Sequence, residues 1–338
     1  MRVARELGLQ SPDTCRIFSA ADVAAWQITP LRPAVVKLDG TWGGTGVKIV
    51  TSADEAVSSI RALLKPQWPG TAWKRYLING DPLALWARKS ASRPVVSLQR
   101  FIPGRPANAM LACWQGELLG LVTTEVIASQ GPTGSATIVR LIDHPEIAEA
   151  ARRVTARLRL SGFHGLDFIL EEATGSAFLI ELNPRCTQLG HLILPAQGDL
   201  VGILCRGLGL RTAPLPEPAI EGDLVGFFPQ AAAWNPDSPY LKLVQHDIPW
   251  SEPALIHELL RSSWSDRRLV MRLYRLLRGL NPERVPELGQ VDLGLMLRPR
   301  ERATRQAPLR WLSKRNRRQA VKFARPEEGS RPDHVVEG

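Results

Sequence analysis

The sequence predicts an α+β fold with two lobes, followed by a basic extension. Three observations predict it. A strand, a glycine-rich loop, a second strand and a helix follow one another near the N-terminus; several strands and a long helix fill the middle; and a later strand hairpin carries acidic and amide side chains. At 338 residues the chain is too long for one small core. Its apolar content of 44% and charged content of 22% are ordinary for a globular protein.

In the N-terminal part, short helices and strands are expected to alternate. Residues 4–9 have the composition of the end of a helix, and residues 19–22 resemble a capping box that opens a short helix. Residues 33–38 and 47–50 are strand candidates on either side of the glycine loop. A second capping box begins a helix over 52–64. This order of elements predicts a small lobe built around the glycine loop.

The middle of the chain is expected to be a block of strands with one long helix. Residues 95–102 form a strand that stops at a Pro-Gly pair, and strands over 107–114 and 118–127 flank a Gln-Gly turn. Residues 143–160 predict a helix that Asp143 caps, with a proline in its first turn. This block predicts a second, larger lobe.

The hairpin that follows carries the strongest signal of chemistry. Residues i and i+2 of a strand point to the same face, so Glu181 and Asn183 project together from an apolar run that looks buried. A buried carboxylate needs a partner, and Mg²⁺ prefers oxygen ligands. Asp167 lies on a similar run, and a Thr-Gly turn at 174–175 would pair the two strands around one ion or two. The alternative is a structural ion pair between Glu181 and Arg185, which explains neither Asn183 nor Asp167.

Two further segments could contact a nucleotide. Four glycines within 40–46 let the backbone approach a ligand closely, and their N–H groups could form an anion nest beside Lys37. The pattern is neither a Walker A loop nor a dinucleotide fingerprint, and such hairpins are also common structural turns. The strand that ends at 99–102 leaves backbone groups that could bind an adenine edge, although an ordinary strand end explains it as well.

Taken in order, these blocks resemble the ATP-grasp superfamily of carboxylate–amine ligases. The resemblance is carried by Lys37 with its glycine loop, by the segment 99–104, by Asp167 in Gly-Leu-Asp-Phe, and by Glu-Leu-Asn-Pro-Arg at 181–185, and it covers roughly residues 1–210. It implies an ATP-grasp fold in which ATP lies between two α+β lobes. It also implies transfer of a phosphoryl group to a carboxylate, followed by attack of an amine or another nucleophile on the acylphosphate.

The resemblance also implies a role for each matching position. Lys37 would contact the ATP phosphates, and Arg185 would face the transferred phosphoryl group or the acceptor carboxylate. Mg²⁺ or Mn²⁺ would be held by Asp167, Glu181 and Asn183. The glycine loop would close over the phosphates, and the backbone around Arg100 and Ile102 would hold adenine. The residues implied to bind ATP are Lys37, Gly40, Gly43, Gly44, Thr45, Gly46, Gln99, Arg100, Phe101, Ile102 and Asn108.

The chain departs from the family pattern in two places. Relatives normally begin with a Rossmann-like lobe, whereas Met1 here falls inside the helix that follows it, so we expect either a separate chain that supplies this lobe or a start upstream of Met1. Many relatives place an acid that holds the ribose where Ala107 and Asn108 stand. These departures leave two other functions open: a nucleotide-binding regulatory or scaffold protein with a degenerate site, or phosphoryl transfer to an acceptor that is not a carboxylate.

Some polar residues outside these blocks have two interpretations each. His191 could line the pocket of the acceptor or could be an ordinary packed histidine. Glu125 and Arg140 could reach a substrate, but we expect solvated charges at a sheet edge. His246 and Asp247 are neighbours on an extended segment and should point apart, so they are expected to shape a loop.

The C-terminal third differs in character. Helices are expected over 188–209, and 221–256 is proline-rich and irregular. Residues 264–280 predict an amphipathic helix whose arginine face could meet an anionic membrane or nucleic acid, although we favour a solvated face. Over 298–325 there are eleven Lys or Arg and one acid, so this segment carries the whole net charge of +10. We expect it to be disordered and able to contact a polyanion.

The domain organisation follows from these segments. We expect a residual helical segment at 1–29, a small glycine-loop lobe at 30–98, a large ATP- and Mg-binding lobe at 99–215, a C-terminal extension with an amphipathic helix at 216–297, and a basic, disordered tail at 298–338.

Cysteine usage and hydropathy bear on location. The four cysteines are scattered without a CxxC spacing, which indicates reduced thiols in the cytoplasm. There is no run of eighteen apolar residues and no apolar core of a signal peptide, so we expect no transmembrane segment. The cysteines are Cys15, Cys113, Cys186 and Cys205.

Overall fold

The computed structural model describes most of the first 260 residues. Two expectations lie outside the described residues: the helix at 264–280 and the basic tail. The same holds for Gly40, Gly43 and Thr45 of the glycine loop. The described residues are 1–39, 44, 46–64, 95–194, 198–212, 220 and 222–260.

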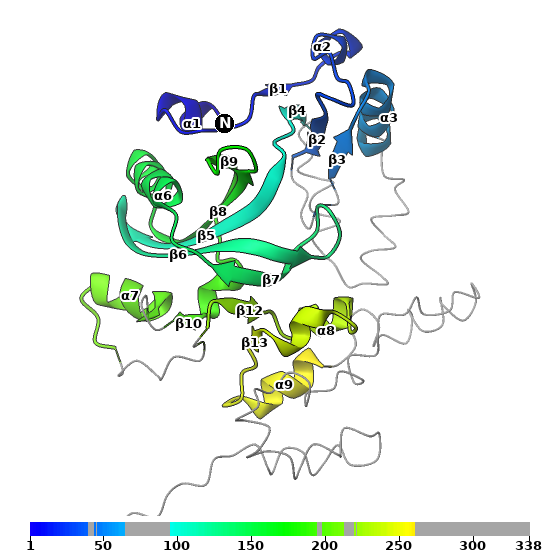
Figure 1. Ribbon diagram of the computed structural model, residues 1–338. Coiled ribbons are helices and arrows are strands. Elements are labelled where there is room, and N and C mark those ends of the chain that lie inside the picture. Colours follow the sequence, from blue (N-terminus) through cyan, green and yellow to red (C-terminus); the bar gives the residue numbers. More distant parts are fainter. Residues whose placement is uncertain are drawn as a thin grey trace, which may run out of the picture.

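The smaller of the two main sheets has four strands and two helices beside it. They are β1 (Thr14–Arg16), α2 (Ala20–Ala24), β2 (Ala34–Leu38), β3 (Val47–Val50), α3 (Ala53–Leu64) and β4 (Val96–Arg100). The strands are antiparallel in the order β1-β4-β2-β3 (Figure 1). The capping box predicted at Ser19 is present, and the hydroxyl of Ser52 accepts a 3.1 Å hydrogen bond from the N–H of Glu55, so both predicted helix starts are confirmed.

The first helix ends earlier than the sequence predicts. Helix α1 (Arg2–Glu6) occupies the very N-terminus, whereas the composition predicts a helix end over 4–9. Gly8 adopts a φ of +65°, which ends the helix because this conformation suits glycine and terminates helical hydrogen bonding. Ala4 of α1 is buried in the core of the larger sheet.

The larger sheet has seven strands. They are β5 (Gly104–Trp114), β6 (Glu117–Ser129), β7 (Ala136–Leu141), β8 (Gly162–Glu171), β9 (Ala177–Asn183), β12 (Leu224–Gly226) and β13 (Gln245–His246). Their order is β13-β12-β7-β6-β5-β8-β9, and every neighbouring pair is antiparallel except β12 with β13. The predicted hairpin around 174–175 is therefore formed by β8 and β9, and the predicted α+β class is confirmed.

Both faces of the larger sheet are covered. Leu111 and Phe168 lie on the face that packs against helix α6 (Pro145–Leu158). Met110 and Val122 lie on the opposite face, under the helical turn η2 (Gln188–His191) and helix α7 (Leu200–Gly207). Because successive residues of a strand alternate between faces, Asp167, the neighbour of Phe168, lies on the η2 side. The Asp167 side chain thus lies on the face opposite the α6 core.

Two details of the helices differ from the sequence prediction. The residue that precedes α6 is His144, not Asp143, and the helix ends where Arg159 takes a left-handed φ of 50°. The stretch 188–209 is not helical throughout, because a short strand pair, β10 (Ile193–Leu194) with β11 (Gly198–Asp199), separates η2 from α7.

The stretch predicted to be irregular after residue 220 contains regular elements. Besides β12 and β13 it holds helices α8 (Gln230–Trp234) and α9 (Pro253–Leu259) and the turn η3 (Pro239–Lys242). Their buried side chains, among them Phe228, Leu241 and Ile256, pack with Ile138 of β7. Strands of two or three residues are too short to show an alternating pattern, so the sequence does not predict them. Within the described residues, no helix is both long and apolar enough to cross a membrane.

Candidate nucleotide and metal site

The predicted metal residues meet on one face of three adjacent strands. Asp167 of β8 lies directly opposite Glu181 of β9 on one side and opposite Asn108 of β5 on the other. Gly165 is the partner of Asn183. Directly paired residues point to the same face of a sheet. The structure therefore brings together Asn108, Asp167, Glu181 and Asn183.

A β-bulge in β9 produces this alignment. Phe168 pairs with Leu179, but Asp167 pairs with Glu181, so Ile180 is an extra residue without a direct partner. If β9 kept the register in which Phe168 pairs with Leu179, Glu181 would lie opposite Leu166, whose side chain packs on the α6 face. The bulge thus places Glu181 and Asn183 on the same face as Asp167.

Hydrogen bonds hold the Asp167 carboxylate from both flanking strands. Its Oδ1 accepts a hydrogen bond from Nδ2 of Asn108 at 2.6 Å, and its Oδ2 accepts one from Nδ2 of Asn183 at 2.8 Å. Each amide uses its nitrogen in this contact, which leaves its carbonyl oxygen available as a ligand. The sequence does not indicate this contact of Asn108, which the family resemblance places among the residues that bind ATP.

The charges around these residues shift their pKa values. Burial raises the pKa of Asp167, and its two amide hydrogen bonds and the charges of Lys37 and Arg185 oppose that shift. Partial burial is the larger of two causes that raise the pKa of Glu181, and the negative charge of the Asp167 carboxylate is the smaller. Burial lowers the pKa of Lys37, while the charges of Glu181, Asp167 and Asp39 act in the opposite direction. Lys37 of the smaller sheet is therefore close enough to interact with both carboxylates.

The donor set fits a hard divalent cation. A buried carboxylate that raises the pKa of a second one, with amide oxygens beside them, is the kind of site that Mg²⁺ or Mn²⁺ would neutralise. Within the described residues no group of three His, Cys, Asp or Glu side chains is placed to hold a metal, and the set here consists of two carboxylates and amides. Glu181 is exposed, contrary to the expectation of burial, because it lies near the end of β9.

Arg185 follows directly on this strand. It is exposed, and its Nη1 donates a 3.1 Å hydrogen bond to the carbonyl oxygen of Cys186. Among the described residues it makes no ion pair with Glu181. Its charge is nevertheless near enough to Asp167 and Glu181 to oppose the rise in the pKa of both. The alternative of a structural Glu181–Arg185 ion pair is therefore wrong.

The described part of the glycine loop touches the larger lobe. Gly44 adopts a φ of +75°, and a Cβ atom there would overlap the carbonyl oxygen of Thr133, in the turn between β6 and β7. The carbonyl oxygen of Gly46 accepts a 2.9 Å hydrogen bond from the N–H of Leu38, which closes the β2–β3 hairpin. Only a residue without a side chain fits at Gly44, so this loop meets the opposite lobe through its backbone.

The strand end predicted to hold adenine is already partly paired. The N–H of Arg100 donates to the carbonyl oxygen of Asp13 at 2.8 Å, and the N–H of Phe101 donates to that of Pro33 at 3.3 Å. Gln99 is buried and donates from Nε2 to the hydroxyl of Thr14. The expectation that the N–H groups of Arg100 and Phe101 are unpaired is wrong, because the N-terminal segment runs beside them. Ile102 is buried.

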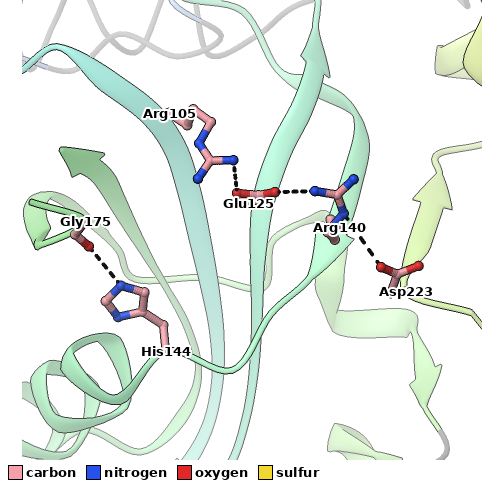
Figure 2. A network of polar contacts seen from close by, with 6 residues as sticks. All are labelled: Arg105, Glu125, Arg140, His144, Gly175 and Asp223. Atoms are coloured by element: carbon pink, nitrogen blue, oxygen red, sulfur yellow. Dashed lines mark hydrogen bonds and ion pairs between the residues drawn. The ribbon is translucent and has the colours of Figure 1, made fainter. Parts of the chain in front are cut away.

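A buried carboxylate outside this site organises a separate network (Figure 2). Glu125 is only 4% exposed and forms ion pairs of 2.8 Å with Arg105 and with Arg140, and Arg140 also lies 3.6 Å from Asp223. The interpretation of Glu125 as a solvated charge is therefore wrong. These residues come from three strands and the segment before β12, and only the strand register brings them together.

His191 also has a partner that the sequence does not indicate. Its Nε2 lies 2.8 Å from Oδ2 of Asp247, and the other oxygen of Asp247 accepts a hydrogen bond from the N–H of Phe228. The neighbouring His246 is buried and contacts the carbonyl oxygen of Leu241 instead. His246 and Asp247 thus have different partners, as expected for neighbours on an extended segment.

Solved structures with a related fold are ligases and a carboxylase. A carboxyaminoimidazole ribonucleotide synthase from Aspergillus clavatus, complexed with ATP, is 15% identical over 63% of this chain and 50% of its own, with a TM-score of 0.43. A D-alanine–D-alanine ligase from Bacillus anthracis is 16% identical over 61% of this chain and 64% of its own, with a TM-score of 0.37. A biotin carboxylase domain from Hydrogenobacter thermophilus is 16% identical over 64% and 46%, with a TM-score of 0.44.

These similarities are too distant to assign a substrate, and the chain spans about half the length of the first of these structures. No curated protein matches the chain by sequence. The sequence model of the ATP-grasp domain family, by contrast, matches residues 84–188, the segment that contains Asn108 and Asp167 and ends just beyond Arg185. The resemblance found in the sequence is thereby confirmed over these residues, which match the ATP-grasp domain family.

Proposed function

We propose that this chain is an ATP- and Mg²⁺-dependent ligase that joins a carboxylate to an amine or another nucleophile. A substrate carboxylate oxygen would attack the γ-phosphorus of ATP, the bond from that phosphorus to the bridging oxygen would break, and ADP would leave an acylphosphate behind. The amine nitrogen would then attack the acyl carbon, release phosphate and lose a proton. Both steps depend on positioning and on neutralised charge rather than on a protein nucleophile.

The observation that carries this proposal is the shared face of Asp167, Glu181 and Asn183, with Lys37 close by on the other sheet. These three residues would hold Mg²⁺, which neutralises phosphate oxygens when it is bound. Lys37 would bind the ATP phosphates, and Arg185 would face the transferred group or the acceptor carboxylate. ATP would lie between a small lobe at 30–98 and a large lobe at 99–215.

The glycine loop would close over the ATP phosphates. The contact of Gly44 with the turn at Thr133 supports this role, since it already brings the loop to the larger lobe. A nucleotide contact at Arg100 and Phe101 would use atoms other than their N–H groups, because those are paired within the chain. The four free cysteines support a reducing compartment such as the cytoplasm.

Substitution of the metal residues tests the proposal. Glu181→Gln and Asn183→Ala should each abolish Mg²⁺-dependent turnover of ATP and leave the melting temperature within a few degrees of wild type. The assay is ADP release in a screen of amino acids and small carboxylates paired with amines. Glu117→Gln, a change of an exposed residue at the far end of the same sheet, is the matched control and should keep full activity. Turnover retained in either site variant would contradict the metal assignment.

A second function is favoured by one observation. The paired N–H groups of Arg100 and Phe101 reduce what this strand end offers to adenine, as a degenerate, regulatory nucleotide site would. That alternative predicts ATP binding without ADP release for every acceptor pair in the screen. It would also give the basic segment at 298–325 the role of recruiting a polyanion.

A further inference from the structure

Asn108 lies in line with the predicted metal residues. It is the direct cross-strand partner of Asp167, and Asp167 is in turn the partner of Glu181, so the three side chains line one face of β5, β8 and β9. The 2.6 Å contact between Nδ2 of Asn108 and Oδ1 of Asp167 is the shorter of the two hydrogen bonds that this carboxylate accepts. The next residue along this line, Thr124 of β6, is fully buried, and its hydroxyl has no hydrogen-bond partner among the described residues.

The two amides bind different oxygens of the same carboxylate. Asn108 approaches Asp167 from one neighbouring strand, and Asn183 approaches it from the other. A carboxylate with one oxygen bound on each side cannot rotate about its Cβ–Cγ bond without losing a hydrogen bond. Each oxygen also keeps a lone pair that faces neither amide. The arrangement fixes the direction in which Asp167 offers these lone pairs.

We propose that Asn108 is a positioning residue for the divalent cation, which orients Asp167 and makes no contact with the nucleotide itself. This inference rests on the proposed function, since it requires that Asp167 be a metal ligand. Outer residues that orient metal ligands typically contribute about 10- to 100-fold to metal affinity. A carboxylate at the same place would repel Asp167 and supply no hydrogen.

The affinity for Mn²⁺, titrated by electron paramagnetic resonance, separates this role from the others. Asn108→Ala should weaken Mn²⁺ binding at least about tenfold. Asn108→Asp, which keeps the shape and loses the donor, should weaken it as well. If residue 108 were itself a metal ligand, Asn108→Asp would instead bind Mn²⁺ as tightly as wild type or more tightly, and that result would overturn the inference.

A second comparison tests the ribose role. The titrations are run with ADP and with pyrophosphate, which has no ribose. A positioning residue should lower Mn²⁺ affinity equally with both, whereas a loss confined to ADP would overturn the inference. Thr123→Val is the matched control, because it removes one side-chain hydrogen bond, to the carbonyl oxygen of Ile142, on the neighbouring strand. It should leave Mn²⁺ affinity unchanged.

The outcomes distinguish this inference from the function on which it rests. If wild type binds no Mn²⁺ with either ligand, the proposed function fails and the inference fails with it. If wild type binds Mn²⁺ and Asn108→Ala binds it equally well, only the inference fails. Melting curves identify a variant that does not fold, and the isosteric Asn108→Asp then decides the question.

Discussion

Lys37 is a residue of one sheet whose charge acts on residues of the other. It lies on β2, yet its ammonium interacts with Asp167 and Glu181 of the larger sheet. Burial lowers its pKa although these carboxylates act in the opposite direction, so the charge is only partly compensated and an anionic phosphate would stabilise it further. The position of this one side chain links the two lobes electrostatically.

Removal of this charge should weaken ATP binding. We expect Lys37→Ala to raise the Kd for Mg-ATP about tenfold or more, which corresponds to the loss of one charge-assisted hydrogen bond of about 1.5–3 kcal/mol. Isothermal titration calorimetry measures this change. Lys48→Ala on the adjacent strand β3, an exposed lysine, is the control and should bind as wild type does. Unchanged affinity in Lys37→Ala would exclude this residue from the site.

The His191–Asp247 contact should make stability depend on pH. The hydrogen bond to Asp247 raises the pKa of His191 above its ordinary value, against the opposing effect of partial burial. A group whose pKa is higher when folded stabilises the fold fully below its unfolded pKa, about 6.5, and loses that contribution as pH rises through the folded value.

His191→Gln should therefore lower the free energy of unfolding at pH 5.5 but hardly at pH 9. Because the side chain of His191 is 57% exposed, we expect a difference of only about 0.5 kcal/mol. Urea denaturation at the two pH values measures it. An equal effect at both values would show that the contact contributes by packing and not through the protonated ring.

At the level of elements, the β8–β9 hairpin shows what can be predicted from the sequence and what cannot. The apolar runs, the Thr-Gly turn and the i, i+2 spacing of Glu181 and Asn183 predict two paired strands with Asp167 near Glu181. The bulge at Ile180 cannot be predicted, because it depends on how β8 and β9 fit the sheet, and the same sequence in a regular register would turn Glu181 to the α6 face. The pattern of residues along the chain predicts which residues form the site, and the strand register determines to which face of the sheet they point.

For the same reason, the sequence does not predict the partners of Asn108 and Glu125. Asn108 meets Asp167 across 59 positions, and Glu125 joins Arg105 to Arg140 across three strands. Nothing local marks a polar residue in an apolar strand as half of such a pair. A buried polar residue predicts only that some partner exists, because an unpaired one would be costly.

The contact between the glycine loop and the β6–β7 turn gives a prediction at the same scale. Gly44→Ala should raise the KM for ATP several-fold or more, because the added Cβ overlaps the carbonyl oxygen of Thr133 and the φ of +75° strains any other residue by about 1 kcal/mol. Steady-state kinetics measure this change. Gly175→Ala is the control, since it also has a positive φ, of +74°, but its Cβ would meet open space. Equal effects of the two changes would mean that backbone strain alone is responsible.

For the whole molecule, the C-terminal segment is part of the larger lobe rather than an appendage to it. Strands β12 and β13 extend the larger sheet, and Phe228, Leu241 of η3 and Ile256 of α9 pack in one core cluster with Ile138. The sequence predicts the order of the main elements up to α6 but assigns this segment to a separate extension, because short strands and helices have no detectable period.

Two truncations should behave differently. A chain that ends at residue 297 should keep the melting temperature and ATP affinity of the full chain, because the basic tail contributes only charge. A chain that ends at residue 221 loses β12, β13 and their helices, and each large side chain left uncovered costs about 2 kcal/mol against a total stability of about 5–15 kcal/mol. We expect the shorter chain to aggregate, as measured by circular dichroism and light scattering. Loss of activity in the chain that ends at 297 would assign a function to the tail.

Within the described residues, two neighbouring backbone segments connect the two sheets. One segment connects β1 to α1, which packs on the core of the larger sheet. The other connects β4 to β5. The N–H of Arg100 donates a hydrogen bond to the carbonyl oxygen of Asp13 where the two segments meet. A body tethered by two adjacent strands has one easy rotation, about the line through both tethers. The smaller sheet should therefore swing about a single hinge axis, and such a motion would change the separation between Lys37 and the carboxylates of the larger sheet.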